Sequence, residues 1–209
     1  MLQPDFIIDV ASPNAYLVHK TLGTIERRTG CRFNYIPCLL GGIFKATGNQ
    51  APMLAFADIK GKLAYDQREI QRFIQQHQLT AFTFNPHFPI NTLTLMRGAA
   101  AMELQGQDAL VQYLDKVLHY MWEEPRNLND PEILASTLTD AGYDAEALIA
   151  STRQAAVKQQ LISNTEKAVQ RGTFGIPTFF VGEEMFFGKE RLGQVEREIM
   201  QPHQPAVGK

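Results

Sequence analysis

The sequence has few cysteines, and their spacing matches no redox or metal motif. Cys31 and Cys38 are the only two among 209 residues. Seven positions apart, they form neither a Cys-x-x-Cys pair nor a zinc pattern. If residues 32–37 are extended, at about 3.3 Å per residue the two cysteines stand roughly 20 Å apart, too far for a mutual disulfide. We therefore expect two buried or half-buried thiols and no metal site.

The sequence also lacks long apolar runs and an excess of charge of either sign. No run approaches the roughly 20 residues that span a bilayer. The 20 basic and 22 acidic residues give a net charge of −2, so neither a nucleic-acid footprint nor a polybasic membrane anchor is visible. No basic segment followed by an apolar one opens the chain, so we expect no secretory signal. These features predict a cytoplasmic protein with no nucleic-acid or membrane partner.

What the sequence does contain is a strand, a tight turn and a helix start near the N-terminus. Residues 5–16 read DFIIDVASPNAY, and a helical pattern continues to a stop at Gly30. Ser12 suits a helix N-cap, and Pro13 suits the first helical position. A helix N-terminus offers unpaired N–H groups and a positive dipole end, which stabilise an anion. Ser12 therefore either only caps its helix or also directs a hydroxyl at a bound anion; the turn alone favours the first interpretation.

The order of the remaining elements is strand, helices, then two strands and a helix. The region 32–37 predicts a strand parallel to the first, joined by a right-handed crossover. Residues 80–89 cannot be helical because of their prolines, and the tail 201–209 is predicted to be disordered. Helical spacing or caps predict helices at about 43–46, 52–57 and 63–77, through much of 91–142, and from 144 onward, with helix continuing from Ser151 to Arg171. Turn signals predict a hairpin at 174–187, after which residues 188–191 lead into a last helix to about 200.

Several short motifs occur in a specific order along residues 5–195. They are DVASPNAY at 9–16, LLGG at 39–42, TGN at 47–49, NPHFPINT at 85–92, FGIPTF at 174–179 and FGKER at 187–191. Together with the element order they resemble an α/β thioredoxin-like fold, βαβ then ββα, with an inserted all-helical domain. The expected boundaries are 1–78 plus 171–209 for the discontinuous thioredoxin-like domain and 79–170 for the insert.

Within that fold, the motif set is similar to the 2-hydroxychromene-2-carboxylate isomerase family of the DsbA-like and kappa-class glutathione transferase branch. The resemblance implies a cis peptide bond at Ile176–Pro177. It also implies that Ser12 is the catalytic residue, donating its hydroxyl to the sulfur of glutathione and favouring the thiolate. Disulfide oxidoreductases carry Cys-x-x-Cys at this helix start. Here residues 12–15 contain no thiol, which excludes dithiol–disulfide exchange.

The resemblance also implies residues for glutathione and for an aromatic substrate. The Ile176 backbone is expected to pair with the cysteinyl part of glutathione. Lys189 suits the γ-glutamyl carboxylate, and Glu190 suits the ammonium. The expected glutathione site comprises Ser12, Asn49, Lys60, Ile176, Pro177, Gly188, Lys189, Glu190 and Arg191. The expected substrate residues are Tyr16, Asn85, His87, Phe88 and Asn91.

The activity implied by the resemblance is isomerisation of 2-hydroxychromene-2-carboxylate to trans-o-hydroxybenzylidenepyruvate, with glutathione as a recycled nucleophile. A kappa-type glutathione transferase or peroxidase is the alternative, because it would use the same scaffold. A third hypothesis is a non-catalytic thioredoxin-fold module that binds peptide beside Pro177. Relatives of this kind are commonly dimers, so a homodimer is expected.

Overall fold

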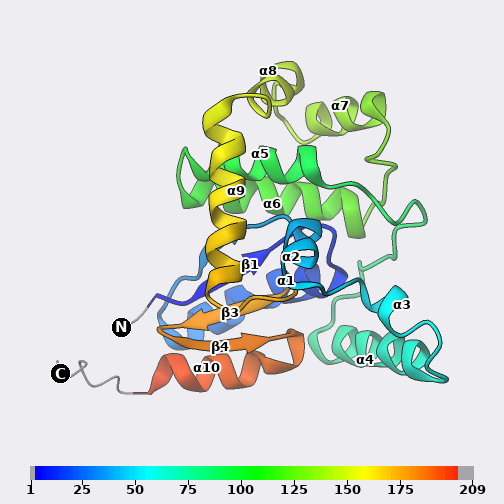
Figure 1. Cartoon of the computed structure of the whole chain (residues 1–209), viewed down its shortest axis with the longest axis vertical. Coiled ribbons are helices and arrows are strands. Elements are labelled where there is room, and N and C mark those ends of the chain that lie inside the picture. The colour runs from blue at the N-terminus through cyan, green and yellow to red at the C-terminus, as the bar shows by residue number, and fades with distance from the viewer. Residues whose placement is uncertain (1–2, 202–209) are drawn as a thin grey trace.

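The computed structural model describes residues 3–201 and is built on a four-stranded mixed sheet (Figure 1). The strand order is β2-β1-β3-β4. β1 (Asp5–Ile8) pairs in parallel with β2 (Asn34–Pro37) and antiparallel with β3 (Thr178–Val181), and β3 pairs antiparallel with β4 (Glu184–Phe187). The two central strands are almost completely buried, so they read as apolar runs in the sequence. The thioredoxin-like sheet is confirmed.

The first helix forms where the sequence predicts it. α1 (Pro13–Thr29) follows the N-cap Ser12 and ends at Gly30, whose φ of 73° is left-handed and therefore suits glycine. Arg27 and Arg28 lie in its last turn, where positive charge complements the helix dipole. α1 connects β1 to β2, so the predicted βαβ unit is confirmed.

A helical region lies between β2 and β3, as expected. α5 packs against both α6 and α9, and α9 also contacts α2 and β2. Figure 1 shows α7 and α8 at the end of the molecule farthest from the sheet. The helices are α2 (Leu40–Thr47), α3 (Pro52–Ala55), α4 (Lys62–His77), α5 (Leu93–Glu103), α6 (Gln107–Trp122), α7 (Pro131–Asp140), α8 (Ala145–Ser151) and α9 (Ala155–Gln170).

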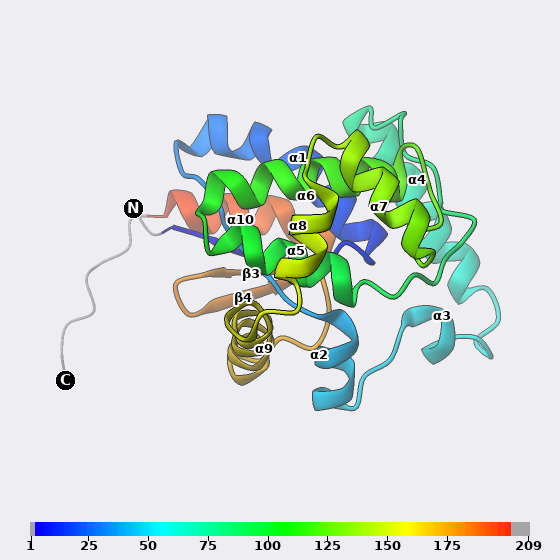
Figure 2. The same ribbon diagram turned by 90° about the horizontal axis from the view of Figure 1, so that it is seen from above.

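One helix boundary differs from the predictions. The helix expected to continue from Ser151 starts only at Ala155, after a turn in which Thr152 donates its hydroxyl to the Ile149 carbonyl. The last α-helix, α10 (Leu192–Met200), starts after a 3₁₀ turn at Lys189–Arg191, so residues 188–191 lead into it as predicted. No side chain caps that start. Figure 2 shows α9 and α10 on opposite sides of the β3–β4 pair.

In the part of the chain that the structure describes, two peptide bonds are cis, Ile176–Pro177 as expected and Phe88–Pro89, which was not predicted. Cys31 and Cys38 are both buried. Within residues 3–201 no helix combines the length and the apolar character needed to cross a membrane. The domain boundaries stay a prediction, and residues 1–2 and 202–209, including most of the tail predicted to be disordered, lie outside the described residues.

Candidate active site

Ser12 lies in a tight turn between β1 and α1 and is almost completely buried. Its Oγ accepts a hydrogen bond from the Ala15 N–H at 3.2 Å, so it caps the helix. Its own N–H donates to the Asp9 carbonyl at 3.1 Å. The predicted strand, turn and helix start are therefore confirmed, and the Ser12 hydroxyl lies at the positive end of α1.

The cis-proline loop brings the two ends of the chain together at this hydroxyl. Ser12 Oγ donates to the Ile176 carbonyl at 3.1 Å, across 164 positions of sequence. The next carbonyl, that of Pro177, accepts the Gly188 N–H at 3.0 Å. The dipeptide Ile176–Pro177 thus contacts both the turn before α1 and the turn before α10. The two predicted halves of the glutathione site are adjacent through this loop.

The second turn carries a pair of opposite charges. Gly188 has a φ of 96°, a left-handed conformation that glycine adopts without strain. Lys189 is 3% exposed, and its ammonium forms an ion pair with Glu190 and lies 5.8 Å from the centre of the Phe73 ring. Arg191 is exposed. The arrangement offers one cation and one anion beside the cis-proline loop.

Asn49 and Lys60 are placed differently from each other. Asn49 donates its side-chain N–H to the Phe174 carbonyl at 2.8 Å, two residues before Ile176. The structure therefore brings Asn49 to the cis-proline loop. Lys60 is exposed, and within residues 3–201 no hydrogen bond or ion pair joins it to another predicted site residue.

The aromatic segment 80–90 packs on the C-terminal end of α6. Asn85 is fully buried, and its amide donates to the carbonyls of Met121 and Arg126 at 3.2 and 3.1 Å. Its side-chain oxygen accepts the His87 N–H at 2.9 Å, so both ends of the amide are used within the protein. Phe88 is half-buried and lies 6.0 Å, ring to ring, from Trp122.

His87 and Asn91 are exposed on the same segment. The Asn91 side-chain oxygen accepts the Leu93 N–H at 3.1 Å, at the start of α5. Both residues are accessible to a ligand, but among the described residues no hydrogen bond, ion pair or ring contact joins either of them to Ser12. Their predicted roles toward a substrate stay predictions.

Comparison with known proteins decides the family. The family model of the DSBA-like thioredoxin domain matches residues 5–200. The chain belongs to that family. Among curated proteins of similar sequence, the 2-hydroxychromene-2-carboxylate isomerase of Sphingobium xenophagum is 29% identical to this chain. The match covers 94% of this chain and 97% of that protein. Glutathione S-transferase kappa 1 of Rattus norvegicus is 26% identical, over 90% and 86% of the two chains.

Solved structures agree with this DSBA-like assignment. A 2-hydroxychromene-2-carboxylate isomerase structure is 26% identical and superposes with a TM-score of 0.78, covering 94% of this chain and 93% of that one. The cytosolic disulfide reductase DsbM of Pseudomonas aeruginosa superposes with a TM-score of 0.60 at 13% identity, over 95% of each chain, and shows the fold alone. This DSBA-like chain carries Ser12–Ala15 at the helix start, without a thiol.

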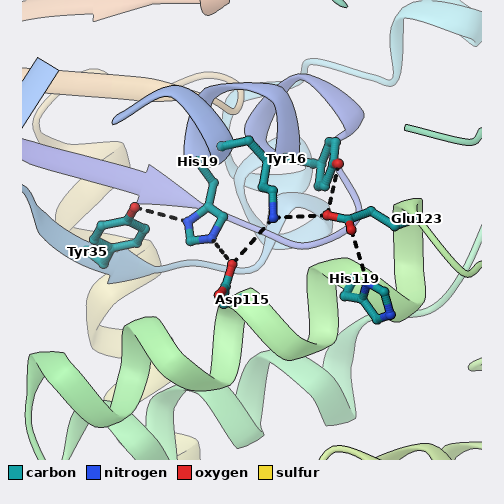
Figure 3. Close-up of polar contacts among 7 residues, drawn as sticks. Tyr16, His19, Tyr35, Asp115, His119 and Glu123 are labelled. Carbon is teal, nitrogen blue, oxygen red and sulfur yellow. Dashed lines mark hydrogen bonds and ion pairs between the residues drawn. The ribbon is translucent and has the colours of Figure 1, made fainter. Parts of the chain in front are cut away.

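The predicted substrate residue Tyr16 belongs to a polar network between α1 and α6 (Figure 3). Tyr16 is 1% exposed, and its hydroxyl donates to Glu123 Oε1 at 3.0 Å. Glu123 also pairs with Lys20 at 3.0 Å and with His119 at 3.0 Å. Burial raises the pKa of Glu123, but the hydrogen bonds from His119, Lys20 and Tyr16 outweigh it and hold that pKa below its usual value.

Sequence reasoning missed this network. Its other half joins His19 Nδ1 to the Tyr35 hydroxyl at 3.0 Å and His19 Nε2 to Asp115 Oδ1 at 3.1 Å. The signals were weak: His119 and Glu123 are four positions apart on a helix, and His19 lies on a buried face of α1. Pairing across two helices about 100 positions apart cannot be read from such spacing.

Asp9 is a second residue whose role emerged only from the structure. Its fully buried side chain accepts the Ala11 N–H at 2.9 Å and the Leu40 N–H at 2.7 Å. Burial raises the pKa of Asp9, and the hydrogen bonds from Ala11, Leu40 and the Thr92 side chain oppose that rise without cancelling it. Asp9 therefore ties the Ser12 turn to the start of α2.

The residues present fit glutathione in chemical type. A thiolate suits the Ser12 hydroxyl at a helix N-terminus, and an amino-acid end suits the Lys189–Glu190 pair. In the first turn of α1, the Asn14 Oδ1 atom is buried and has no hydrogen-bond partner in the structure. It is an acceptor that a bound N–H group would satisfy. An open hollow of about 760 Å³ between α7 and α8 includes none of the predicted site residues.

Proposed function

We propose that this chain is a glutathione-dependent isomerase that converts 2-hydroxychromene-2-carboxylate to trans-o-hydroxybenzylidenepyruvate. The observation that carries the proposal is the contact between the Ser12 hydroxyl, at the N-terminus of α1, and the carbonyl before the cis-proline. Support also comes from relatives named as this isomerase that match nearly the whole chain. A cytoplasmic location and a homodimer belong to the same proposal.

Bound glutathione would supply a thiolate nucleophile that adds to the conjugated system of the substrate and is released once the former double bond has rotated. Ser12 favours that thiolate by donating a hydrogen bond from its hydroxyl to the sulfur. In the structure the same hydroxyl donates to the Ile176 carbonyl. When the hydroxyl turns to the sulfur, the Ile176 carbonyl becomes available for the cysteinyl N–H of the ligand. The positive end of α1 adds about 0.3–1 kcal/mol of stabilisation, and more when partly buried.

Lys189 and Glu190 hold the γ-glutamyl end in this proposal. They already form an ion pair with each other beside Pro177. The ligand carboxylate would take the place of Glu190 as the partner of Lys189, and the ligand ammonium would take the place of Lys189 as the partner of Glu190. Asn49 contacts the same loop through its bond to the Phe174 carbonyl. These residues bind and orient the cofactor, whereas the hydrogen bond that stabilises the thiolate comes from the Ser12 hydroxyl.

The aromatic substrate is proposed to approach from the segment 80–91. The half-buried Phe88 supplies aromatic surface there, and it is connected to the buried Tyr16 ring through Trp122 and Phe82 by ring contacts of 5.6 to 6.0 Å. The exposed His87 and Asn91 are the polar groups available to a carboxylate or hydroxyl of the substrate. Asn85 acts in this proposal by shaping the turn through its bond to the His87 N–H.

A kappa-type glutathione transferase or peroxidase is the second candidate. It is supported by the likeness to glutathione S-transferase kappa 1 over most of the chain. Such an enzyme would use Ser12, Ile176 and Lys189 in the same way and differ in the second substrate. The isomerase assay with the chromene carboxylate, run beside conjugation and peroxidase assays, separates the two activities.

The test of the proposed function is a titration of glutathione into the protein across pH, following thiolate absorbance. We expect bound glutathione to titrate well below its free value near 8.5, and Ser12→Ala to remove most of that shift. Asp144→Ala is the matched control, because Asp144 caps the remote helix α8 in the same way, by accepting the Ala147 N–H. Absence of glutathione binding at millimolar concentration would refute the proposed function.

A further inference from the structure

The single tryptophan of the chain touches the turn that carries Ser12. Trp122 is the last residue of α6 and is fully buried. Its indole N–H donates to the Val10 carbonyl at 2.9 Å, across 112 positions of sequence. Val10 is also fully buried and lies beyond the end of β1, two residues before Ser12. Its carbonyl therefore depends on a partner from outside the sheet.

The other side of the Trp122 indole faces the segment proposed for the substrate. The rings of Phe82, Phe84 and Phe88 lie 5.9, 5.7 and 6.0 Å from it. Trp122 thus packs against this aromatic segment with its rings and holds the Ser12 turn with its N–H. One side chain therefore contacts both regions directly.

We propose that Trp122 is a positioning residue, whose indole N–H holds the turn so that Ser12 stays at the helix N-terminus in the geometry that stabilises a thiolate. The proposal deepens the proposed function and rests on it for its meaning in catalysis. Its physical basis is that a buried carbonyl without a donor is costly, so the turn shifts toward any other donor when the indole is removed. A shift of the turn changes the distance between the sulfur of a thiolate bound at Ser12 and the first N–H groups of α1.

A purely structural tryptophan would behave differently. It would contribute packing, and its loss would lower stability without changing the electrostatics at Ser12. A matched control exists on the same helix. Tyr113 is 1% exposed, and its hydroxyl donates to the backbone carbonyl of Leu95 at 2.9 Å. Tyr113→Phe removes a buried aromatic donor to a carbonyl, as Trp122→Phe does, but in the contact between α6 and α5.

The experiment uses Ser12→Cys as a reporter that needs no glutathione. A thiol at a helix N-terminus has a lowered pKa, which the pH dependence of alkylation by iodoacetamide measures. Cys31 and Cys38 are both buried, and the parent protein gives their background. We expect Trp122→Phe to raise the reporter pKa by about half a unit or more, roughly a threefold loss of thiolate at neutral pH. Tyr113→Phe should leave it unchanged. Equal shifts in both variants would overturn the proposal.

A second measurement covers the case in which Trp122→Phe does not fold. The chain has one tryptophan, so its indole N–H gives a single side-chain signal of that type in a proton–nitrogen NMR spectrum. Alkylation of the Ser12→Cys reporter by iodoacetamide should move that signal if the turn and the indole are coupled. An unmoved signal contradicts the proposal.

Glutathione itself separates this proposal from the proposed function. If the protein binds no glutathione but the reporter pKa still depends on Trp122, the proposed function is wrong and the positioning role stands. If glutathione binds with a lowered thiol pKa that Trp122→Phe does not change, the proposed function stands and the positioning role is wrong.

Discussion

The turns before α1 and before α10 both lead into helices at the candidate site, but they are held in different ways. The turn of Asp9 to Ser12 is tied to α6 by Trp122, to α2 by the Leu40 N–H and to the cis-proline loop by Ile176. The turn at residues 188–191 has no side-chain cap. It is held by a backbone bond to Pro177, by an ion pair between neighbours in sequence and by the buried Lys189 side chain, which lies near the Phe73 ring of α4.

This difference suggests a division of work between the two turns. Partners from three separate elements leave the first turn little freedom, which suits a hydroxyl that must meet a reacting atom. The Lys189–Glu190 ion pair joins neighbours in sequence, so the charges of a ligand can take the place of either partner while the backbone bond to Pro177 remains. We therefore expect changes in the first turn to affect stability and chemistry, and changes in the second to affect binding more than the chemical step.

The largest effect is expected from Asp9→Asn, which breaks the first turn. The Asp9 carboxylate accepts the backbone N–H groups of Ala11 and Leu40, one at each oxygen. In the Asp9→Asn variant the side-chain NH₂ replaces one of these oxygens, so two donors face each other in a fully buried site. We expect a loss of about 1–3 kcal/mol in the free energy of unfolding, measured with urea. Asp5→Asn at the start of β1 is the control, since its partner Arg171 is partly exposed and the pair should be worth less than about 1 kcal/mol. Equal losses would contradict the special role of the first turn.

A smaller effect is expected from Lys189→Ala, which tests the second turn. Loss of the cation should raise the KM for glutathione about tenfold with kcat within about twofold, the pattern of lost uniform binding. Lys62→Ala is a close control, because Lys62 also pairs with a carboxylate, that of Asp66, and lies over a phenylalanine ring, that of Phe56. A fall in kcat as large as the rise in KM would show that the second turn also serves the chemical step.

The smallest effect is expected where α1 rests on α6, at Glu123. Its folded-state pKa is held below the usual 4.5, so its contribution to stability is present above about pH 4.5 and is lost as the pH falls through the folded-state pKa. Glu123→Gln should lower the free energy of unfolding by about 1 kcal/mol near neutral pH. The difference in this free energy between the variant and the parent should vanish in acid. Glu124→Gln is the control, since the Glu124 side chain is 66% exposed and its distance to His119, 3.5 Å, is longer than the 3.0 Å between Glu123 and His119. A difference that grew in acid would contradict the sign of this shift.

Much of the fold was predictable because its signals are local. The Ser12 cap, the Pro13 start and the Gly30 stop lie within or beside one helix, and their effects depend on neighbours in sequence. The 3₁₀ turn between Gly188 and α10 was not predicted, because it accompanies a backbone bond to the distant Pro177 carbonyl. The cis bond at Phe88–Pro89 was missed because only about 5–6% of X–Pro bonds are cis, and no local pattern indicated one.

By itself, the sequence determined the order of elements, the capped start of α1 and the absence of a thiol there, because caps, breakers and alternation act over a few residues. Only the tertiary structure decided that Trp122 reaches Val10, that Asp9 reaches Leu40 and that Glu123 gathers Tyr16, Lys20 and His119. These partners lie up to 112 positions apart, and which buried donor meets which acceptor depends on how the helices pack on the sheet.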